Sequence, residues 1–377
     1  MNKLLNQEQL ELVELVKDFA ENEVAPIMEE YDKSGEIPIE TYKKAFETGI
    51  HVAGYPEEYG GTGLDVLTTS LIIEELAKVD GGFALGIATI ELASVPVLIA
   101  GNDAQKKLFG DIVASGNFAS FALTEPQAGS DVSAIRTKAV KDGGEYVISG
   151  NKCFITNGGL AGVYVVFAVT DKSKGIKGIS AFIVEKDREG ISVGKEEDKM
   201  GIRLTNTVEL VFDNVRIPAG NLLGNEGDGF KIAMRTLDMT RPLVAAGAVG
   251  LSQHALDLSV KYAKERVTFG KPIINNQAIQ FMLADMKIKT ELARQYARYA
   301  CQLIDAGKLD PVSSAIAKCH ASDTAMSVAA DAVQIHGGYG YMREYPVEKL
   351  MRDAKIFQIV EGTNQIQRIV ISGSMIK

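Results

Sequence analysis

The sequence predicts an α+β fold in three parts: an N-terminal helical domain over residues 1–118, a middle antiparallel β domain over residues 119–230 and a C-terminal four-helix bundle over residues 231–377. Three observations predict this order. Apolar residues have helical spacing in the first part, short β-rich runs alternate with glycine and charged turns in the second, and long helical patterns return in the third. The chain of 377 residues is also longer than one hydrophobic core usually spans, so two or three domains are expected.

The N-terminal part begins with an amphipathic helix. Its apolar stripe consists of Leu12, Leu15, Val16 and Phe19, and the helix should end before Pro26 because the residue before a proline disfavours helical backbone. Further helical patterns cover residues 39–48, 67–78, 87–100 and 104–115, and the glycine-rich segment 55–63 is expected to be a loop.

The clearest strands of the middle part are residues 146–149, 163–169, 179–184 and 208–212, with turn residues between them. No helix-length insert separates neighbouring strands, which disfavours a parallel βαβ sheet and favours an antiparallel sandwich or barrel. The C-terminal helices are predicted at residues 230–266, 276–307, 311–335 and 364–372. Pro242 should kink or restart the first of them.

Composition excludes several classes of protein. A formal net charge of −9 leaves no basic field for a nucleic-acid partner. The N-terminus turns polar too early for a signal peptide, and no later run approaches the about 20 apolar residues of a membrane helix, so we expect a cytoplasmic protein without a membrane span. The spacing of Cys153, Cys301 and Cys319 indicates neither disulfides nor a thiolate metal site, and no metal is expected.

Common catalytic motifs are missing from the sequence. It has no Gly-x-Gly-x-x-Gly opening a helix after a strand, no Walker loop and no His-Glu-x-x-His spacing among its four histidines. A nicotinamide Rossmann enzyme, a P-loop enzyme and a zinc hydrolase therefore lose support.

Two segments carry most of the functional information. Residues 122–131 (ALTEPQAGSD) join a strand-like run to a turn with free hydroxyl and amide groups, a shape suited to holding a flat heterocycle. Residues 358–367 (QIVEGTNQIQ) place one carboxylate, Glu361, before a glycine and a polar helix start. Together they suggest a cofactor and a base.

Six ordered segments resemble the acyl-CoA dehydrogenase family, its short- and medium-chain members most closely, along essentially the whole chain. They are residues 122–131, 150–158 (GNKCFITNG), 199–203 (KMGIR), 266–272 (RVTFGKP), 334–340 (QIHGGYG), and 345–354 (YPVEKLMRDA) leading into 360–363 (VEGT). The resemblance implies a bound FAD, an acyl-CoA substrate, a homotetramer formed as a dimer of dimers, and electron-transfer flavoprotein as the oxidant.

Similar proteins carry the catalytic base at the position of Glu361. Burial against an acyl chain would raise the pKa of this carboxyl group toward the working pH. The alternative is a solvated glutamate at a helix start, which Ile359, Val360 and Gly362 around it argue against. Some relatives place the base on an earlier helix, near the position of Thr240, which cannot serve as one.

The resemblance also implies the FAD contacts. Around the flavin ring these are Phe121, Leu123, Thr124, Gly129, Ser130, Phe154, Ile155 and Thr156, with Phe154 at a position where many relatives have tryptophan. For the pyrophosphate and adenosine of a neighbouring subunit they are Arg266, Thr268, Phe269, Asn276, Gln277, Gln334, Ile335, Gly337 and Gly338, with Thr363 and Gln365 near the base. A plain β core is the alternative for the first group, and a helix C-cap is the alternative for Gly337 and Gly338.

Substrate contacts are implied for Ser130, Asp238, Arg241 and Gly362, although Asp238 and Arg241 could equally form a surface ion pair at helical spacing. Glu91 interrupts an apolar helix at a position toward the pocket floor, and Val360 stands where most relatives have tyrosine. These two residues favour short- to medium-chain, branched or cyclic substrates.

The leading hypothesis is α,β-dehydrogenation of an acyl-CoA to the trans-2-enoyl-CoA, or the reverse reduction, with Glu361 taking the α-proton. An acyl-CoA oxidase of the same fold and a non-catalytic flavin- or CoA-binding assembly protein are the alternatives. Retention of Glu361 and of every flavin segment speaks against the second alternative.

Overall fold

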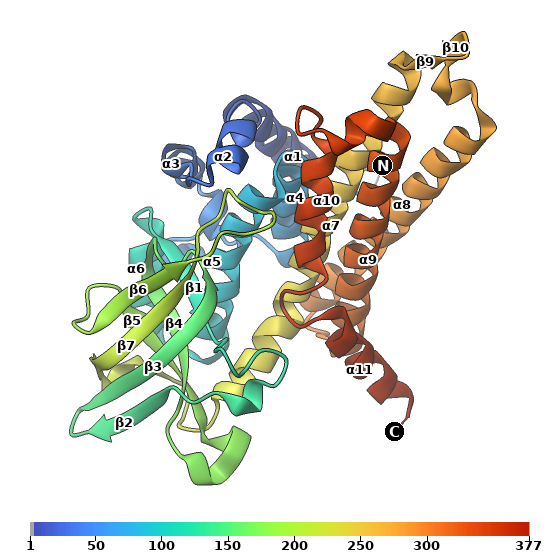
Figure 1. The fold of residues 1–377 in the computed structure, drawn as a ribbon. Coiled ribbons are helices and arrows are strands. Elements are labelled where there is room, and N and C mark those ends of the chain that lie inside the picture. Colours follow the sequence, from blue (N-terminus) through green and yellow to red (C-terminus); the bar gives the residue numbers. More distant parts are fainter. Residues whose placement is uncertain (1–3, 377) are drawn as a thin grey trace.

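Residues 4–376 are described by the computed structural model, and they form the three predicted parts in the predicted order (Figure 1). The N-terminal part consists of α1 (Gln7–Phe19), α2 (Met28–Ser34), α3 (Ile39–Glu47), α4 (Val66–Ala77), α5 (Gly81–Ala100) and α6 (Asp103–Ala114). The four later helical patterns are confirmed. The short helix α2 was missed, and in the α1 stripe Leu15 is exposed, because Val13 and Val16 form the buried face.

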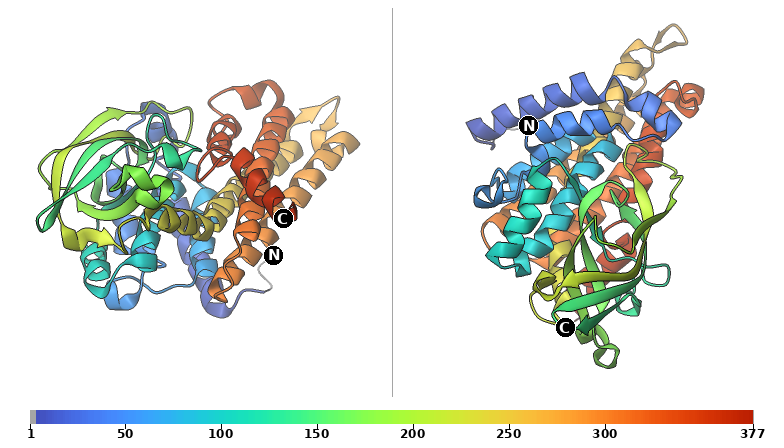
Figure 2. Two further views of the ribbon diagram at one scale, coloured as in Figure 1. Left: turned by 90° about the horizontal axis from the view of Figure 1, so that it is seen from below. Right: turned by 90° about the vertical axis from the view of Figure 1, so that its left-hand side faces the viewer.

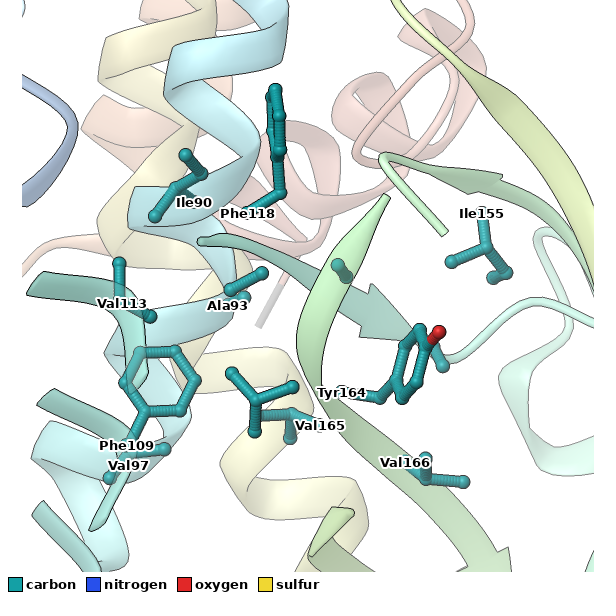
Figure 3. Packing of buried hydrophobic residues seen from close by; sticks show 14 of the residues in the cluster. Ile90, Ala93, Val97, Phe109, Val113, Phe118, Ile155, Tyr164, Val165 and Val166 are labelled. Carbon is teal, nitrogen blue, oxygen red and sulfur yellow. The ribbon is translucent and has the colours of Figure 1, made fainter. Parts of the chain in front are cut away.

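Helix α5 is the central element of the core. It begins earlier than predicted because Asp80 caps it, its carboxylate accepting a hydrogen bond of 2.7 Å from the Phe83 amide. Its apolar side chains meet the middle part of the chain: Figure 3 shows Ile90 and Ala93 of α5 near Phe118 and Val165. The strand that follows α6 therefore packs directly against α5 of the helical part.

The middle part has β1 (Phe118–Ala122), β2 (Lys138–Asp142), β3 (Glu145–Thr156), β4 (Ala161–Val169), β5 (Ile179–Glu185), β6 (Ile191–Glu196), β7 (Thr207–Pro218) and β8 (Leu222–Leu223). They form one sheet in the order β6-β7-β3-β2-β4-β5-β8, with β1 beside β4. Most pairs are antiparallel, as predicted. The pairs β1–β4 and β2–β4 are parallel, which differs from the prediction. The chain between the paired strands is long enough to cross back to the same end of the sheet, so both strands of each pair run in the same direction.

The C-terminal part consists of α7 (Gly229–Glu265), α8 (Gln277–Asp305), α9 (Pro311–His336), α10 (Val347–Phe357) and α11 (Asn364–Met375). Helices α7, α8 and α9 pack side by side, α10 packs against α7 and α9 as the fourth member of the bundle, and α11 packs against α9. Helix α7 continues through Pro242 without a restart. Burial of α7 against its neighbours offsets the lost backbone hydrogen bond.

A small hairpin of β9 (Val267–Thr268) and β10 (Lys271–Pro272) projects from the bundle between α7 and α8. The hairpin and the β sheet lie at opposite ends of the molecule, as all views show (Figures 1 and 2).

A buried ionic cluster joins the three parts of the chain. Lys349 of α10 lies 2.6 Å from Asp80 at the start of α5 and 2.5 Å from Asp353 of α10. The second oxygen of Asp353 accepts a hydrogen bond of 2.6 Å from the Ile202 amide in the middle part. The two carboxylates raise the pKa of Lys349, although burial opposes this. The cluster thus fixes the sheet relative to the bundle.

Two helices of the described chain, α5 and α7, are long and apolar enough to cross a membrane by length and composition alone. The expectation that no apolar run approaches this length is therefore wrong. Most of each apolar window is buried inside the protein, which is typical of core helices.

Candidate active site

Glu361 lies on the loop between α10 and α11. This loop is on the side of the bundle that faces the β sheet (Figure 1). Its φ of 51° lies in the left-handed region, which is rare for residues other than glycine, and Gly362 follows with φ of 88°. The loop is closed by a hydrogen bond of 3.0 Å from the Asn364 amide to the Gln358 carbonyl. Such backbone strain persists only where the surroundings impose it.

Three buried side chains from three helices impose this conformation by binding the loop carbonyls. Arg241 of α7 donates to the Glu361 carbonyl over 3.3 Å. Gln367 of α11 donates to the carbonyls of Glu361 and Gly362, over 3.2 and 2.8 Å. Lys318 of α9 donates to the Gly362 carbonyl over 2.8 Å. A Cβ at Gly362 would lie 2.9 Å from the Gln367 amide nitrogen, so space as well as φ favours glycine there.

The Glu361 carboxylate has one hydrogen-bond donor among the described residues. Thr240 Oγ1 of α7 donates to Glu361 Oε2 over 2.7 Å. Burial raises the pKa of Glu361 to about 7, against the opposing effects of the Thr240 hydrogen bond and the charges of Arg241 and Lys318. Glu361 is partly buried and its carboxylate is hydrogen-bonded to Thr240, so the alternative of a fully solvated glutamate at a helix start is not what the structure shows. Thr363, not Glu361, caps α11.

Sequence reasoning missed Thr240 and Lys318 as partners of this loop. Thr240 stands near the position where some relatives place the base, a role that threonine cannot fill, and nothing near Lys318 in sequence indicated a site. One signal was available: Lys318 is a charged residue within a run of small apolar residues of α9, and its side chain is fully buried. Burial lowers its pKa to about 8.

Asp238 and Arg241 do form the ion pair that was the alternative to a substrate site, with 2.6 Å between Oδ1 and the guanidinium. The pair is not on the surface, because the side chains are only 17% and 4% exposed. It orients Arg241 toward the Glu361 loop.

A second group of predicted residues comes together on β1, β3 and the loop after β1. Ser120 Oγ donates to the Thr156 carbonyl over 2.8 Å, and the Cys153 amide donates to the Thr124 carbonyl over 3.0 Å. Phe154 stands out because it is 64% exposed and has φ of 56°. Its neighbours on these segments divide into buried residues, Leu123 and Ile155, and partly buried ones, Phe121, Thr124 and Thr156.

A buried ion pair between Lys152 and Glu125 supports the loop after β1. The sequence did not indicate this pair. Lys152 Nζ lies 2.7 Å from Glu125 Oε1 and 3.0 Å from the Leu123 carbonyl. The Glu125 carboxylate also accepts hydrogen bonds from the amides of Arg136 and Thr137, over 2.6 and 3.1 Å. The exposed end of this loop carries Gly129 and Ser130.

Most of the remaining predicted cofactor residues lie far from the sheet. Arg266, Thr268 and Phe269 are on the β9–β10 hairpin at the opposite end of the molecule, and Asn276 and Gln277 start α8 beside it (Figures 1 and 2). Phe269 is completely exposed, with φ of 50°, and the Arg266 guanidinium lies 5.4 Å from the centre of the Tyr339 ring. One chain therefore presents its predicted FAD residues in two separate groups.

The hairpin group continues at the end of α9. Gly337 is the C-cap of that helix, with φ of 60°, which confirms the structural alternative for this residue. Gln334 and Gly338 are exposed, whereas Ile335 is buried in the core of the bundle. Thr363 and Gln365 lie beside the base instead, at the start of α11.

The donor chemistry of the two groups fits a flavin adenine dinucleotide. An exposed aromatic ring at Phe154 with the Thr124, Ser130 and Thr156 hydroxyls suits a flat polar heterocycle. The exposed guanidinium of Arg266 suits a diphosphate.

Glu91 is buried within α5, with 5% of its surface exposed. Its Oε1 accepts a hydrogen bond of 2.9 Å from the Gly54 amide, and burial raises its pKa to about 7. An open surface groove of about 540 Å³ lies elsewhere, between α7 and α8, and is lined by none of the predicted site residues. Residues 4–376 contain no group of three or more histidine, cysteine or acidic side chains that could hold a metal ion.

Family models of three successive domains match the chain. They are "Acyl-CoA dehydrogenase, N-terminal domain" over residues 6–117, the middle domain over residues 120–215 and the C-terminal domain over residues 227–376.

Three relatives are similar over the whole chain. An acryloyl-CoA reductase (NADH) of Anaerotignum propionicum is 46% identical over 380 residues, covering 100% of this chain and 96% of its own length. The structure of butyryl-CoA dehydrogenase from Megasphaera elsdenii superposes with a TM-score of 0.97 at 47% identity, with 100% of each chain covered. A chain in a structure of the electron transferring flavoprotein of Acidaminococcus fermentans also gives a TM-score of 0.97, at 48% identity and with 100% of each chain covered. The predicted fold and the resemblance seen in the sequence are thereby confirmed.

Proposed function

The chain belongs to the acyl-CoA dehydrogenase family and is an oxidoreductase, and from this premise we propose that Glu361 is the base of its reaction. The proposed reaction is α,β-dehydrogenation of a short- to medium-chain acyl-CoA to the trans-2-enoyl-CoA. One observation supports this assignment. Burial raises the pKa of the Glu361 carboxyl group to about 7, and the loop that carries this group is held by side chains from three helices.

The residues around Glu361 act in distinct ways. Removing the proton next to a thioester carbonyl requires a base whose pKa is near the working pH. Arg241, Lys318 and Gln367 hold the backbone of Glu361 and Gly362, so that the carboxyl group is presented from a fixed loop. FAD, when bound, supplies the acceptor for the hydride that leaves the β carbon.

We propose that Phe154 and the hydroxyls of Thr124, Ser130 and Thr156 hold the flavin ring. The β sheet that carries these residues is at the opposite end of the molecule from the β9–β10 hairpin, and this separation supports a site completed by a neighbouring subunit (Figure 2). A homotetramer, built as a dimer of dimers, is the assembly we propose. An exposed apolar stripe on α8 supports association: Phe281, Ile288, Leu292 and Tyr299 are 48–60% exposed along the helix.

Electron-transfer flavoprotein is the partner we propose for reoxidation. It is supported by the likeness to a chain in the structure of such a flavoprotein from Acidaminococcus fermentans. The reverse direction, reduction of an enoyl-CoA, is a second candidate, because one relative is named an acryloyl-CoA reductase. The same base would serve both directions, acting as an acid in the second.

Anaerobic reduction of the bound flavin by butyryl-CoA tests the assignment of the base. Glu361→Gln keeps the shape of the side chain and should slow reduction by about 10²- to 10⁴-fold while FAD and acyl-CoA still bind. Glu344→Gln changes an exposed glutamate of the same domain and should leave the rate unchanged. Reduction of Glu361→Gln at close to the wild-type rate would place the base elsewhere, and hydrogen peroxide release on turnover in air would favour an oxidase.

A further inference from the structure

Thr240 lies in α7 with its hydroxyl between two acceptors. Its Oγ1 is 2.7 Å from Glu361 Oε2 and 3.2 Å from the carbonyl oxygen of Thr236, four residues earlier in the helix. The side chain is buried, with 2% of the residue exposed. Because a hydroxyl carries a single proton, it can donate to only one of these acceptors at a time.

We propose that Thr240 is a positioning residue that keeps a hydrogen bond to Glu361 both before and after the base has taken up its proton. The inference rests on the proposed role of Glu361. While Glu361 is ionised, the Thr240 hydroxyl donates to the carboxylate, which is the shorter of its two contacts.

The hydrogen bond reverses when Glu361 has taken the α-proton. A protonated carboxyl group has an O–H of its own, and with the proton on Oε2 this O–H donates to the Thr240 oxygen. The Thr240 proton then turns to the Thr236 carbonyl, which lies within reach at 3.2 Å. This change requires rotation of the Thr240 hydroxyl about its Cβ–Oγ1 bond and of the new carboxyl O–H about its C–O bond, and it moves no heavy atom.

The charged groups that face Glu361 do not bind its carboxylate. Arg241 of α7, which is paired with Asp238, and Lys318 of α9 donate to the carbonyls of Glu361 and Gly362, as does the neutral Gln367 of α11. Their charges favour the ionised base without directing its oxygens. Within residues 4–376, Thr240 alone donates a hydrogen bond to the carboxylate.

Two substitutions of Thr240 distinguish the effect of its hydroxyl group from the effect of its side-chain shape. Thr240→Val keeps the branched shape and loses the hydroxyl, and Thr240→Ser keeps the hydroxyl. In the FAD-loaded enzyme, the protonation of Glu361 is followed by infrared difference spectroscopy of its carboxyl stretch, identified by its loss in Glu361→Gln. The pH dependence of anaerobic flavin reduction by butyryl-CoA is the second measurement.

The Val variant should raise the midpoint of both titrations by about 1 pH unit, since of the two hydrogen bonds that are lost the one to the charged form is the stronger. Reduction should then be about tenfold slower near pH 6 and close to wild type near pH 9. The Ser variant should behave as wild type. Thr290→Val is the matched control: Thr290 in α8 is also buried and also donates to the carbonyl four residues earlier, over 2.8 Å, but is remote in the fold from Glu361.

An unchanged midpoint in Thr240→Val, or slowing by the same factor at every pH, would overturn the inference. If Thr240→Val does not fold, Thr240→Ala, which also lacks the hydroxyl, takes its place. Failure of the proposed function is recognised separately, because Glu361→Gln would then reduce its flavin at close to the wild-type rate.

Discussion

The ammonium group of Lys318 lies 2.8 Å from the backbone carbonyl oxygen of Gly362, directly after the proposed base. It also donates to Asn364 Oδ1 over 3.0 Å. A buried cation is costly unless it is paired or hydrogen-bonded, and burial lowers the pKa of Lys318 to about 8. The charge of Glu361 opposes this shift, so the lysine and the base stabilise each other's ionised forms.

Replacing Lys318 with Met should weaken the loop and the base together. Met keeps an unbranched side chain but removes the charge and both hydrogen bonds, which should lower the free energy of unfolding by about 1.5–3 kcal/mol. The midpoint of flavin reduction with pH should move upward, because a cation that favours ionised Glu361 is lost. Urea unfolding and a pH series of reduction rates measure the two effects. Lys308→Met, at an exposed lysine, should change neither, and an unmoved midpoint in Lys318→Met would contradict the coupling.

The contrast between Glu361 and Lys318 illustrates what the sequence could predict. The loop at Glu361 has a local signature, a glycine for positive φ and a threonine that caps the next helix, and these neighbours lie in one short segment. The side chains that hold the loop come from α7, α9 and α11, and Thr240 meets the base across 121 positions of the chain. A single sequence carries no local sign of such contacts.

The same distinction between local patterns and distant contacts explains which helices and strands could be predicted. Helices with a long apolar face and strands buried on both sides were predictable, whereas β6 is exposed and polar and was not found. The parallel pairing of β1 with β4 depends on how the chain returns, which periodicity does not describe. Helix α10 could have been found, since Val347, Leu350, Ala354 and Phe357 are buried at helical spacing.

Glu91 should make stability depend on pH in a direction opposite to that of a salt-bridged carboxylate. Burial raises its pKa from 4.5 to about 7, so between these values the folded protein binds more protons than the unfolded chain. Stability contributed by this group is therefore present at low pH and lost as the pH rises through that window. Glu91→Gln does not titrate and should gain stability relative to wild type between about pH 5 and pH 8. Urea unfolding at both pH values measures this. The exposed Glu189→Gln is the control, and a wild-type advantage that grows with pH would refute the prediction.

A charge on the exposed face of α8 should disrupt the proposed tetramer. Leu292 is 59% exposed in the single chain and lies in the middle of the apolar stripe on α8. Leu292→Glu would place an unpaired charge in an apolar interface, so the native mass should fall. FAD content should fall with it, because in the proposed assembly the hairpin residues complete a neighbour's site. Light scattering after size exclusion and the flavin absorbance give both values. Leu15→Glu, at a residue of α1 that is 53% exposed, should remain a tetramer. A monomeric wild type with full FAD would refute the cross-subunit site.

The acyl specificity should depend on the two residues that bracket the proposed pocket. Val360 precedes the base and packs only partly against the core of the bundle, so it leaves space where a tyrosine would fill it. Glu91, at the position where similar medium-chain enzymes place a glutamate toward the pocket floor, should restrict the far end of the pocket, because its buried carboxyl group would gain no hydrogen-bond partner from a long alkyl tail. Butyryl- to octanoyl-CoA and compact branched or cyclic acyl-CoAs should therefore be better substrates than palmitoyl-CoA. Val360→Tyr should lower kcat/KM for a branched substrate more than for butyryl-CoA, and Val360→Ile, a smaller increase in volume, should have an intermediate effect. A profile of kcat/KM that peaks at palmitoyl-CoA, or an unchanged ratio between branched and straight chains in Val360→Tyr, would show that neither residue shapes the pocket in this way.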